Sequence, residues 1–164
     1  MPVLHIVYAS TSGHTAYVLD TLCDYLKKEM RELVIKKQRA EQTQSDDLLD
    51  SDVLLLASST WNTGGVEGQL NPHMHALLKE RARAVNLKKI KCVLIGLGDE
   101  RYHYTVGALK HLGDFVSEHK GTVLIPALRI VNEPYGQEER VRAWGKELLA
   151  AIRGLDTSRL TPEA

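Results

Sequence analysis

The chain has 164 residues, of which 43% are hydrophobic, 26% charged and only 5% aromatic. This length suits one globular domain that buries a core of its own without disulfides or a structural metal. Basic and acidic residues balance at 21 each, so the formal charge is zero. We therefore expect no large positive electrostatic field that would bind nucleic acid or an anionic membrane.

The two cysteines, Cys23 and Cys92, fit neither a disulfide framework nor a zinc-binding spacing. We expect them to be small residues of the core or its boundary. The purely apolar runs, such as residues 53–57, are too short to cross a bilayer. The first residues lack the basic segment of a secretory signal. These features predict a soluble protein of the cytoplasm.

The chain begins with a mostly apolar run at residues 3–8, which predicts a strand. From Ala16 to Met30 apolar residues recur at steps of three and four, as on one face of a helix. Residues 33–37 predict a second strand whose polar character suits a sheet edge. Residues 53–58, apolar up to Ala57, predict a third strand followed by polar residues.

A loop rich in glycine, asparagine and threonine, residues 59–68, leads to a helix that should begin at Asn71-Pro72, a cap residue followed by proline. Residues 92–96 predict the fourth strand. Residues 105–120 have helical spacing, and Gly121 is the expected C-cap.

Residues 122–131 predict a fifth strand, which Pro126 interrupts in a way that suits a sheet edge. An amphipathic helix at 137–153 closes the fold, and 154–164 are expected to form a loose tail. Strands that each lead into a helix predict an α/β fold, with one domain at 1–153 and a doubly wound, five-stranded parallel sheet covered by helices on both faces.

The turn between the first strand and the first helix gathers four hydroxyls, a glycine and a histidine without any lysine or arginine: Ser10, Thr11, Ser12, Gly13, His14 and Thr15. Converging N–H groups, hydroxyls and the positive end of a helix dipole make such a turn a candidate phosphate site without formal charge. An ordinary Ser/Thr helix cap explains the same residues equally simply. The spacing of an ATP-binding P-loop is missing.

Two further loops bring aromatic residues to the same edge of the sheet. Trp61 lies in a polar, glycine-rich loop after the third strand, while Tyr102 and Tyr104 follow the fourth. The tryptophan could simply cover the end of the sheet. Together with the hydroxyl-rich turn, these loops predict a planar ring sandwiched between aromatic side chains, with its phosphate at residues 10–15.

These motifs, S-T-S-G-H-T, S-T-W and G-L-G-D-E-R-Y-H-Y in this order, resemble those of short-chain flavodoxins over residues 3–152. The resemblance implies the sheet order 2-1-3-4-5. It also implies a monomeric, low-potential one-electron carrier that holds FMN non-covalently. Such a carrier has no catalytic residue and exchanges electrons transiently with a reductase donor and an acceptor enzyme.

The resemblance also assigns the cofactor contacts. The phosphate would lie among Ser10, Thr11, Ser12, Gly13, His14 and Thr15, joined by Ser59. Thr60 would meet the ribityl chain, and Trp61 and Tyr102 would cover the two ring faces. The backbone of Leu97 and Gly98 and the side chain of Asp99 would contact the polar edge of the ring, with Tyr104 further out. Asn62, Thr63 and Gly64 would complete the first ring-contacting loop.

This sequence departs from the family pattern in two respects. Many flavodoxins are strongly acidic, whereas this chain is neutral, which predicts a potential for the second electron that is on the order of tens of millivolts less negative. Asn62 stands where several relatives have glycine, and a Cβ resists positive φ by roughly 1–2 kcal/mol, less for asparagine. In the family, the carbonyl after the tryptophan turns toward the flavin on one-electron reduction. We expect this turn to cost more free energy with Asn62 than with glycine.

Two other functions share the predicted fold. A cofactor-free binding or signalling module is one, although a phospho-acceptor receiver needs acidic residues where Ser10 and Ser58 stand. An FMN-dependent oxidoreductase that uses NAD(P)H is the other, and the sequence shows neither a nicotinamide motif nor a long insertion to support it.

Overall fold

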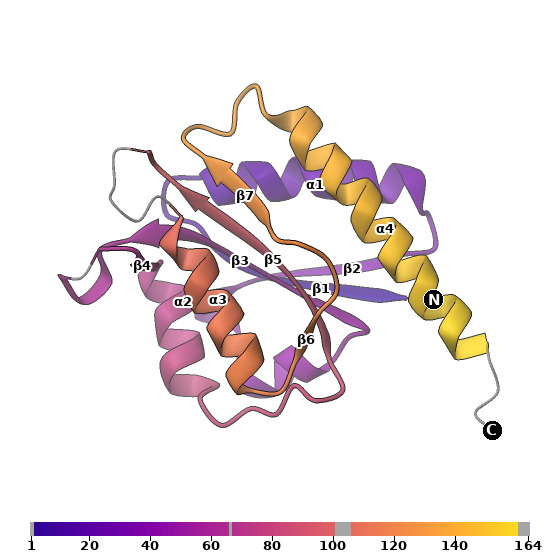
Figure 1. Ribbon diagram of the computed structural model, residues 1–164, viewed down its shortest axis with the longest axis horizontal. Coiled ribbons are helices and arrows are strands. Elements are labelled where there is room, and N and C mark those ends of the chain that lie inside the picture. Colours follow the sequence, from indigo (N-terminus) through magenta and orange to yellow (C-terminus); the bar gives the residue numbers. More distant parts are fainter. Residues whose placement is uncertain (1, 66, 101–105, 161–164) are drawn as a thin grey trace.

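A parallel sheet forms the centre of the molecule (Figure 1). The computed structural model describes residues 2–65, 67–100 and 106–160, of which 156–160 are described by their backbone alone. The parallel strands are β1 (Val3–Ala9), β2 (Val34–Arg39), β3 (Val53–Trp61), β5 (Lys91–Gly98), β6 (Thr122–Val123) and β7 (Leu128–Val131). They run in the order β2-β1-β3-β5, and β6 and β7 both pair with β5. The predicted order is confirmed, with the fifth strand split in two.

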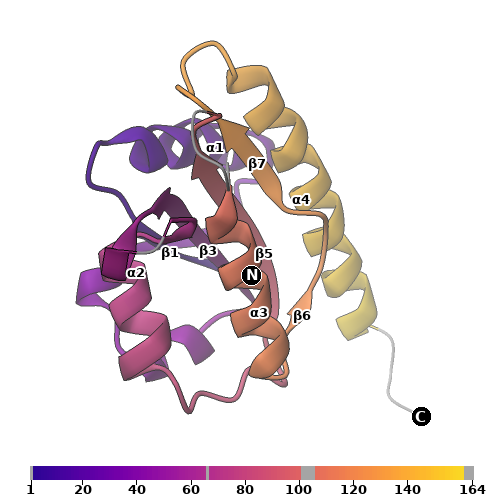
Figure 2. The ribbon, with the colours of Figure 1, turned by 60° about the vertical axis from the view of Figure 1, so that its left-hand side comes forward.

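Helices cover both faces of this sheet (Figure 2). One face carries α1 (His14–Glu29) and α4 (Glu138–Leu160). The other carries α3 (Gly107–Glu118) and α2 (Pro72–Ala76), which continues as the π-helical turn η4 (Leu77–Arg81). The connections include three 3₁₀ turns, η1 (Ala40–Gln42), η2 (Ser45–Leu49) and η3 (Thr63–Gly65).

The predicted helix start at Asn71 is confirmed. The Asn71 side chain accepts a hydrogen bond of 2.9 Å from the backbone N–H of His73, and Pro72 takes the first helical position. This arrangement satisfies one amide that the helix itself cannot, and the missing N–H of proline costs nothing there.

Two hydrophobic cores hold the helices to the sheet. The first packs Leu22 of α1 and Leu148 of α4 against Leu55 of β3. The second packs Leu56 of the same strand against Met74 and helix α3. Both cysteines are buried and free, as predicted, Cys23 in the first core and Cys92 in the second. Burial raises the pKa of the Cys92 thiol to about 12.

Two predicted helix ends are wrong. Helix α4 continues to Leu160 instead of ending at Arg153, so residues 154–160 are helical and not a loose tail. The reason is Leu155, which extends the apolar stripe of Leu148 and Ile152 and packs on the first core.

Helix α3 also ends differently from the prediction. The left-handed residue after it is Lys120, with φ 68°, and not Gly121. The N–H of Gly121 donates to the Val116 carbonyl at 2.8 Å and that of Lys120 to Ser117 at 3.2 Å, the pattern of a Schellman motif. A Cβ on Gly121 would lie 2.8 Å from the Val116 side chain, so glycine is needed there for space.

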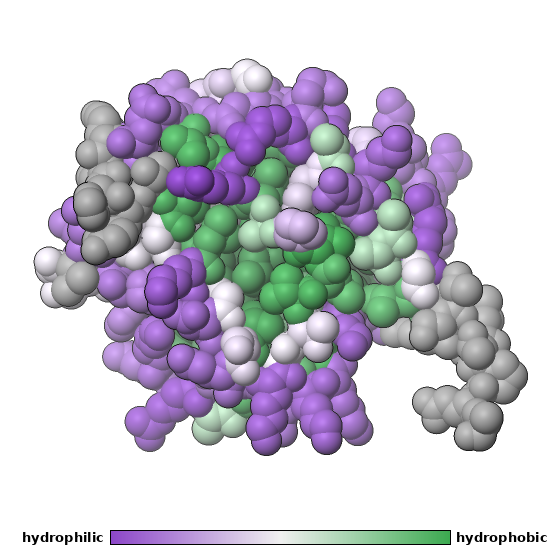
Figure 3. Space-filling view, in the orientation of Figure 1, coloured by the Kyte–Doolittle hydropathy of each residue, from purple (hydrophilic) through white to green (hydrophobic). Residues whose placement is uncertain are grey.

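The outer edge of the sheet, formed by β6 and β7, is bent at Pro126. The indole N–H of Trp144 in α4 donates to the Pro126 carbonyl at 2.8 Å and fixes this bend. Figure 3 shows apolar side chains over this part of the molecule, and Val123 of β6 is 42% exposed. The proline keeps the edge from offering an unbroken row of backbone groups to another strand.

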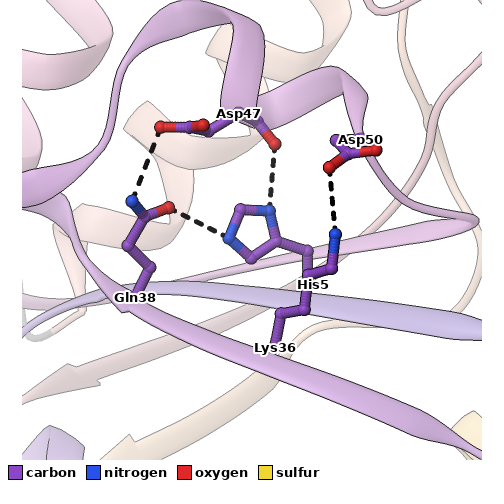
Figure 4. A network of polar contacts seen from close by, with 5 residues as sticks. All are labelled: His5, Lys36, Gln38, Asp47 and Asp50. Atoms are coloured by element: carbon purple, nitrogen blue, oxygen red, sulfur yellow. Dashed lines mark hydrogen bonds and ion pairs between the residues drawn. The ribbon is translucent and has the colours of Figure 1, made fainter.

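A network of polar contacts around the buried His5 ties η2 to the opposite edge of the sheet (Figure 4). The ring nitrogens of His5 lie 3.0 Å from the Asp47 carbonyl and 3.1 Å from Oε1 of Gln38. Gln38 in turn donates to the Asp47 carboxylate at 3.5 Å, and Lys36 pairs with Asp50 at 2.9 Å. The network explains how a histidine is accommodated in a strand that is otherwise apolar inside.

The register of the parallel strands brings their carboxyl ends together. Ala9 lies opposite Ser58, and Ser59 lies opposite Leu97. The loops after β1, β3 and β5 therefore open at one edge of the sheet, where ligands bind in this class of fold. In the part of the chain that is described, no helix has both the length and the apolar character needed to cross a membrane.

Candidate functional site

A cleft of about 950 Å³ opens at the carboxyl ends of β1, β3 and β5, a volume within the range of small-molecule sites. The predicted residues that line it are Ser12, His14, Ser59, Thr60, Trp61, Asn62, Leu97, Gly98 and Asp99. Lining residues outside the predicted cofactor contacts are Gly65, Glu67, Gly68, Glu100, Asn132 and Glu133.

The other predicted residues divide into two groups. Ser10, Thr11, Gly13, Thr15, Thr63 and Gly64 belong to the same loops but are not among the residues that line the cleft. Tyr102 and Tyr104 lie outside the described residues. Of the two aromatic side chains expected to cover the ring, only Trp61 is therefore among the described residues.

The turn after β1 is shaped by Gly13, the residue directly before α1. Its φ of 88° lies in the left-handed region, which glycine adopts readily. The Ser10 hydroxyl accepts a hydrogen bond of 3.4 Å from the backbone N–H of Ala16, so it acts in part as a helix cap. Thr15 is 1% exposed, and its hydroxyl has no hydrogen-bond partner among the described residues. A capping role alone leaves this hydroxyl unexplained, because buried polar groups are normally paired.

Alternation along the end of β3 sends neighbouring side chains to opposite sides. Trp61 is 38% exposed, and its indole N–H donates to the Ser59 hydroxyl at 2.7 Å. The Thr60 hydroxyl donates to the Leu97 carbonyl at 2.8 Å and accepts from the backbone N–H of Ala108 at 3.2 Å. Its hydrogen bonds thus join β3 to β5 and α3.

The loop after Trp61 folds back onto the end of β3. A short antiparallel strand, β4 (Gln69–Leu70), pairs with residues 60–61, a pairing that the sequence did not predict. The Thr63 hydroxyl donates to the Leu70 carbonyl at 2.6 Å, and Gly64 has a φ of 72°. Thr63 and Gly64 therefore shape this loop from beside the cleft.

Helix α3 supports the wall of the cleft at Gly68. A Cβ on Gly107 would lie only 2.4 Å from the Gly68 carbonyl oxygen, so the two backbones meet in close contact. His111, one turn further along α3, lies close to the Gly68 backbone. Burial, followed by the charges of Lys79 and Lys110, holds the pKa of His111 below its usual value.

Asn132, which follows β7, holds the loop after β5 in place. Its backbone N–H donates to the Gly98 carbonyl at 2.7 Å, and its side-chain oxygen accepts from the backbone N–H of Glu100 at 3.0 Å. Its φ of 66° is left-handed, which asparagine tolerates better than most residues. The only sequence signal for this role was an asparagine directly after a strand.

The charge around the cleft differs from that of the whole chain. Glu67, Asp99, Glu100 and Glu133 line it, and His14 is the one described lining residue that can carry a positive charge. A formal net charge of zero therefore coexists with acidic walls around the cleft.

The chain is similar in sequence to known proteins. The family model described as flavodoxin matches residues 6–144. A probable flavodoxin 2 of Bacillus subtilis (strain 168) is 28% identical over 142 residues, which cover 85% of this chain and 88% of that protein. The flavodoxin of Nitratidesulfovibrio vulgaris (strain DSM 19637 / Miyazaki F) is 28% identical over 148 residues, or 90% and 97% of the two chains.

Solved structures share the fold as well. Oxidised flavodoxin 1 from Bacillus cereus superposes with a TM-score of 0.79 at 21% identity, covering 90% of this chain and 97% of that one. Flavodoxin 2 from the same organism gives 0.74 at 24% identity, covering 94% and 99%. On the strength of the family model, the chain belongs to the flavodoxin family.

Proposed function

We propose that this flavodoxin passes electrons singly between protein partners on a non-covalently bound FMN, and that it is not itself an enzyme. Flavodoxins bind FMN and transfer electrons, so membership of the family identifies FMN as the cofactor and electron transfer as the broad function. The observation that supports the site is a single cleft that joins the hydroxyl-rich turn at Ser12 and His14 to the indole of Trp61.

The residues of the turn fit a phosphate group. Gly13 is the N-cap of α1 and makes no side-chain cap hydrogen bond, and an anion near a helix N-terminus is favoured by the helix dipole. The buried Thr15 hydroxyl lacks a partner among the residues described, and a phosphate oxygen would supply one. Ser12 and His14 line the cleft beside it. We assign the phosphate to this turn, together with Ser10, Thr11 and Ser59.

The residues of the other two loops fit a flat ring. Trp61, a residue that is 38% exposed, offers an aromatic side chain, while Leu97, Gly98 and Asp99 supply a backbone and carboxylate edge. We assign one ring face to Trp61 and the opposite face to Tyr102, with Tyr104 further out. Thr60 and Asn62 contribute their backbone, while Thr63 and Gly64 hold the loop in shape. FMN, when bound, supplies the reversible electron chemistry, and the chain positions it and limits its contact with water.

The partners in this proposal are redox proteins that dock transiently at the cleft. The acidic side chains around it, including Glu100 and Glu133, support docking onto a basic surface, since complementary charge speeds encounter. We propose a monomer that works in the cytoplasm as one FMN-binding domain.

Titration of FMN with the apoprotein tests this proposal. We expect quenching of flavin fluorescence at one FMN per chain and a protein that turns yellow. Rapid mixing of the FMN-loaded protein with NADPH separates a carrier from a reductase. A carrier leaves the flavin absorbance unchanged until a partner reductase is added, whereas direct bleaching by NADPH would show an enzyme.

A further inference from the structure

The hydroxyl-rich turn contains no lysine or arginine of its own, yet the fold places a guanidinium beside it. Strand β2 runs parallel to β1 and ends at Arg39, which lies opposite Tyr8. The Arg39 Nη1 donates to the carbonyl oxygen of Ser10, the first residue of the turn, at 3.4 Å. The pairing of these strands thus brings a cation from 29 residues away to the predicted phosphate site.

The guanidinium is held in this position by a second contact. Its central carbon lies 5.4 Å from the centre of the Tyr8 ring, within the range of a cation–π interaction. Tyr8 is 7% exposed and belongs to the first core, so the surface on which Arg39 rests is rigid. A preorganised side chain loses less conformational freedom when a ligand arrives.

The charge of Arg39 is available for a ligand. Within the described residues Arg39 forms no ion pair, whereas neighbouring Lys37 is neutralised by Asp20 at 2.7 Å. Arginine carries five N–H donors in a fork that matches phosphate oxygens. One of these reaches the Ser10 carbonyl, and the hydroxyl of Thr15 in the same turn still lacks a partner among the residues described.

We propose that Arg39 is a specificity residue for the cofactor phosphate, selecting phosphorylated FMN over riboflavin through its charge and its remaining N–H donors. This inference rests on the proposed function and adds a residue outside the three ligand loops. The site is therefore not free of formal charge, contrary to what residues 10–15 alone indicated. The attraction between the Arg39 guanidinium and the FMN phosphate, across several ångströms of partly screened solvent, should strengthen FMN binding by about three- to ten-fold.

The experiment measures the dissociation constants of FMN and riboflavin by fluorescence quenching for the wild type and for Arg39→Gln. We expect about three- to ten-fold weaker FMN binding, unchanged riboflavin binding and a smaller dependence of FMN affinity on salt. Arg31→Gln is the matched control, because it makes the same charge change on an exposed side chain before the opposite end of β2. It should alter neither affinity.

A conservative variant separates charge from shape. Arg39→Lys should restore most of the preference for FMN, because it keeps the cation near the turn. Equal weakening of both ligands by Arg39→Gln would show a structural role for the side chain and overturn the proposal. Unchanged FMN binding would overturn it as well. Failure of the wild type to bind either flavin would instead reject the proposed function itself, on which this inference depends.

Discussion

The indole N–H of Trp61 donates to the hydroxyl of Ser59 at 2.7 Å, which joins the residue expected to cover the flavin ring to one expected near the phosphate. Both side chains lie on the same side of β3 because they are two residues apart. The tryptophan is therefore held over the strand end instead of moving freely. The hydrogen bond sets the orientation from which the indole meets a cofactor.

Replacing Ser59 with alanine should release this tryptophan. Trp61 is 38% exposed and Trp144 is buried, so a Trp144→Phe background isolates its fluorescence. We expect Trp61 emission to shift toward that of a hydrated, mobile indole, with a loss of stability below about 1 kcal/mol. Ser58→Ala is the control: its buried hydroxyl accepts from the Asn71 N–H at 3.1 Å, so this change should cost about 1–3 kcal/mol without altering the emission. Unaltered emission in Ser59→Ala would contradict the role of the bond.

Asn62 is expected to hinder the turn of its peptide toward the flavin on reduction. The structure adds a second restraint, because the Asn62 carbonyl accepts a hydrogen bond of 2.9 Å from the backbone N–H of Gly65. Asn62→Gly removes the Cβ but leaves this bond in place. We expect a less negative potential for the first electron, by an amount corresponding to about 1 kcal/mol or less. A redox titration of the FMN-loaded variant measures it, and an unchanged potential would count against the Cβ as the obstacle.

The acidic residues that line the cleft bear on the flavin potential more directly than the net charge of the chain. The prediction of a less negative potential was drawn from that net charge and from the few formal charges in the two ring-contacting loops, where Arg101 opposes Asp99 and Glu100. The four carboxylates lining the cleft act against it. Glu133→Gln should make the potential for the second electron less negative by roughly 20–70 mV, the effect of a unit charge about 10 Å away. Glu32→Gln, an exposed change beyond the amino end of β2, should leave it within a few millivolts. Equal shifts in both variants would mean that distance to the cleft does not matter.

The strands and the three ligand loops were predictable because each depends on local pattern, whereas the strand order came from the resemblance to short-chain flavodoxins. Apolar runs fix the strands, and polar, glycine-rich segments at their carboxyl ends mark the loops. The end of α4 was mispredicted because the polar residues after Arg153 obscured a single further apolar position, Leu155. Strand β4, with two residues, is too short to show any periodicity.

The supporting residues were not predictable for a different reason. Asn132 and Arg39 reach the site only through strand pairing, since each lies far along the chain from the loop it contacts. Thr60 was expected to meet the ribityl chain and lines the cleft, but the sequence could not show that its hydroxyl bonds to Leu97 and Ala108. Sequence indicates which loops meet, whereas register decides what each side chain contacts.

The contact between Gly107 and Gly68 should be sensitive to a single methyl group. A Cβ at Gly107 would meet the Gly68 carbonyl oxygen at 2.4 Å, and a backbone atom cannot move aside without displacing the cleft wall. We expect Gly107→Ala to lower stability by about 1–3 kcal/mol and to weaken FMN binding. Gly113→Ala is a stringent control in the same helix, because nothing lies within 4 Å of its Cβ position. It should stabilise the protein by about 0.5–1 kcal/mol in chemical denaturation. Similar losses in both variants would show that α3 tolerates no alanine for reasons unrelated to the cleft.

His111 on the same helix should make stability fall on the acid side of neutrality. Burial and the nearby Lys79 and Lys110 lower its pKa in the folded protein, so the unfolded chain takes up a proton first as pH falls through about 6.5. Folding is therefore favoured above that pH and progressively weakened below it. Urea unfolding between pH 5 and 8 should show a shallower acid-side loss for His111→Gln than for the wild type. In NMR titrations, Lys79→Met should raise the His111 pKa by removing a positive neighbour; a lower value would refute the assignment of Lys79 as a cause.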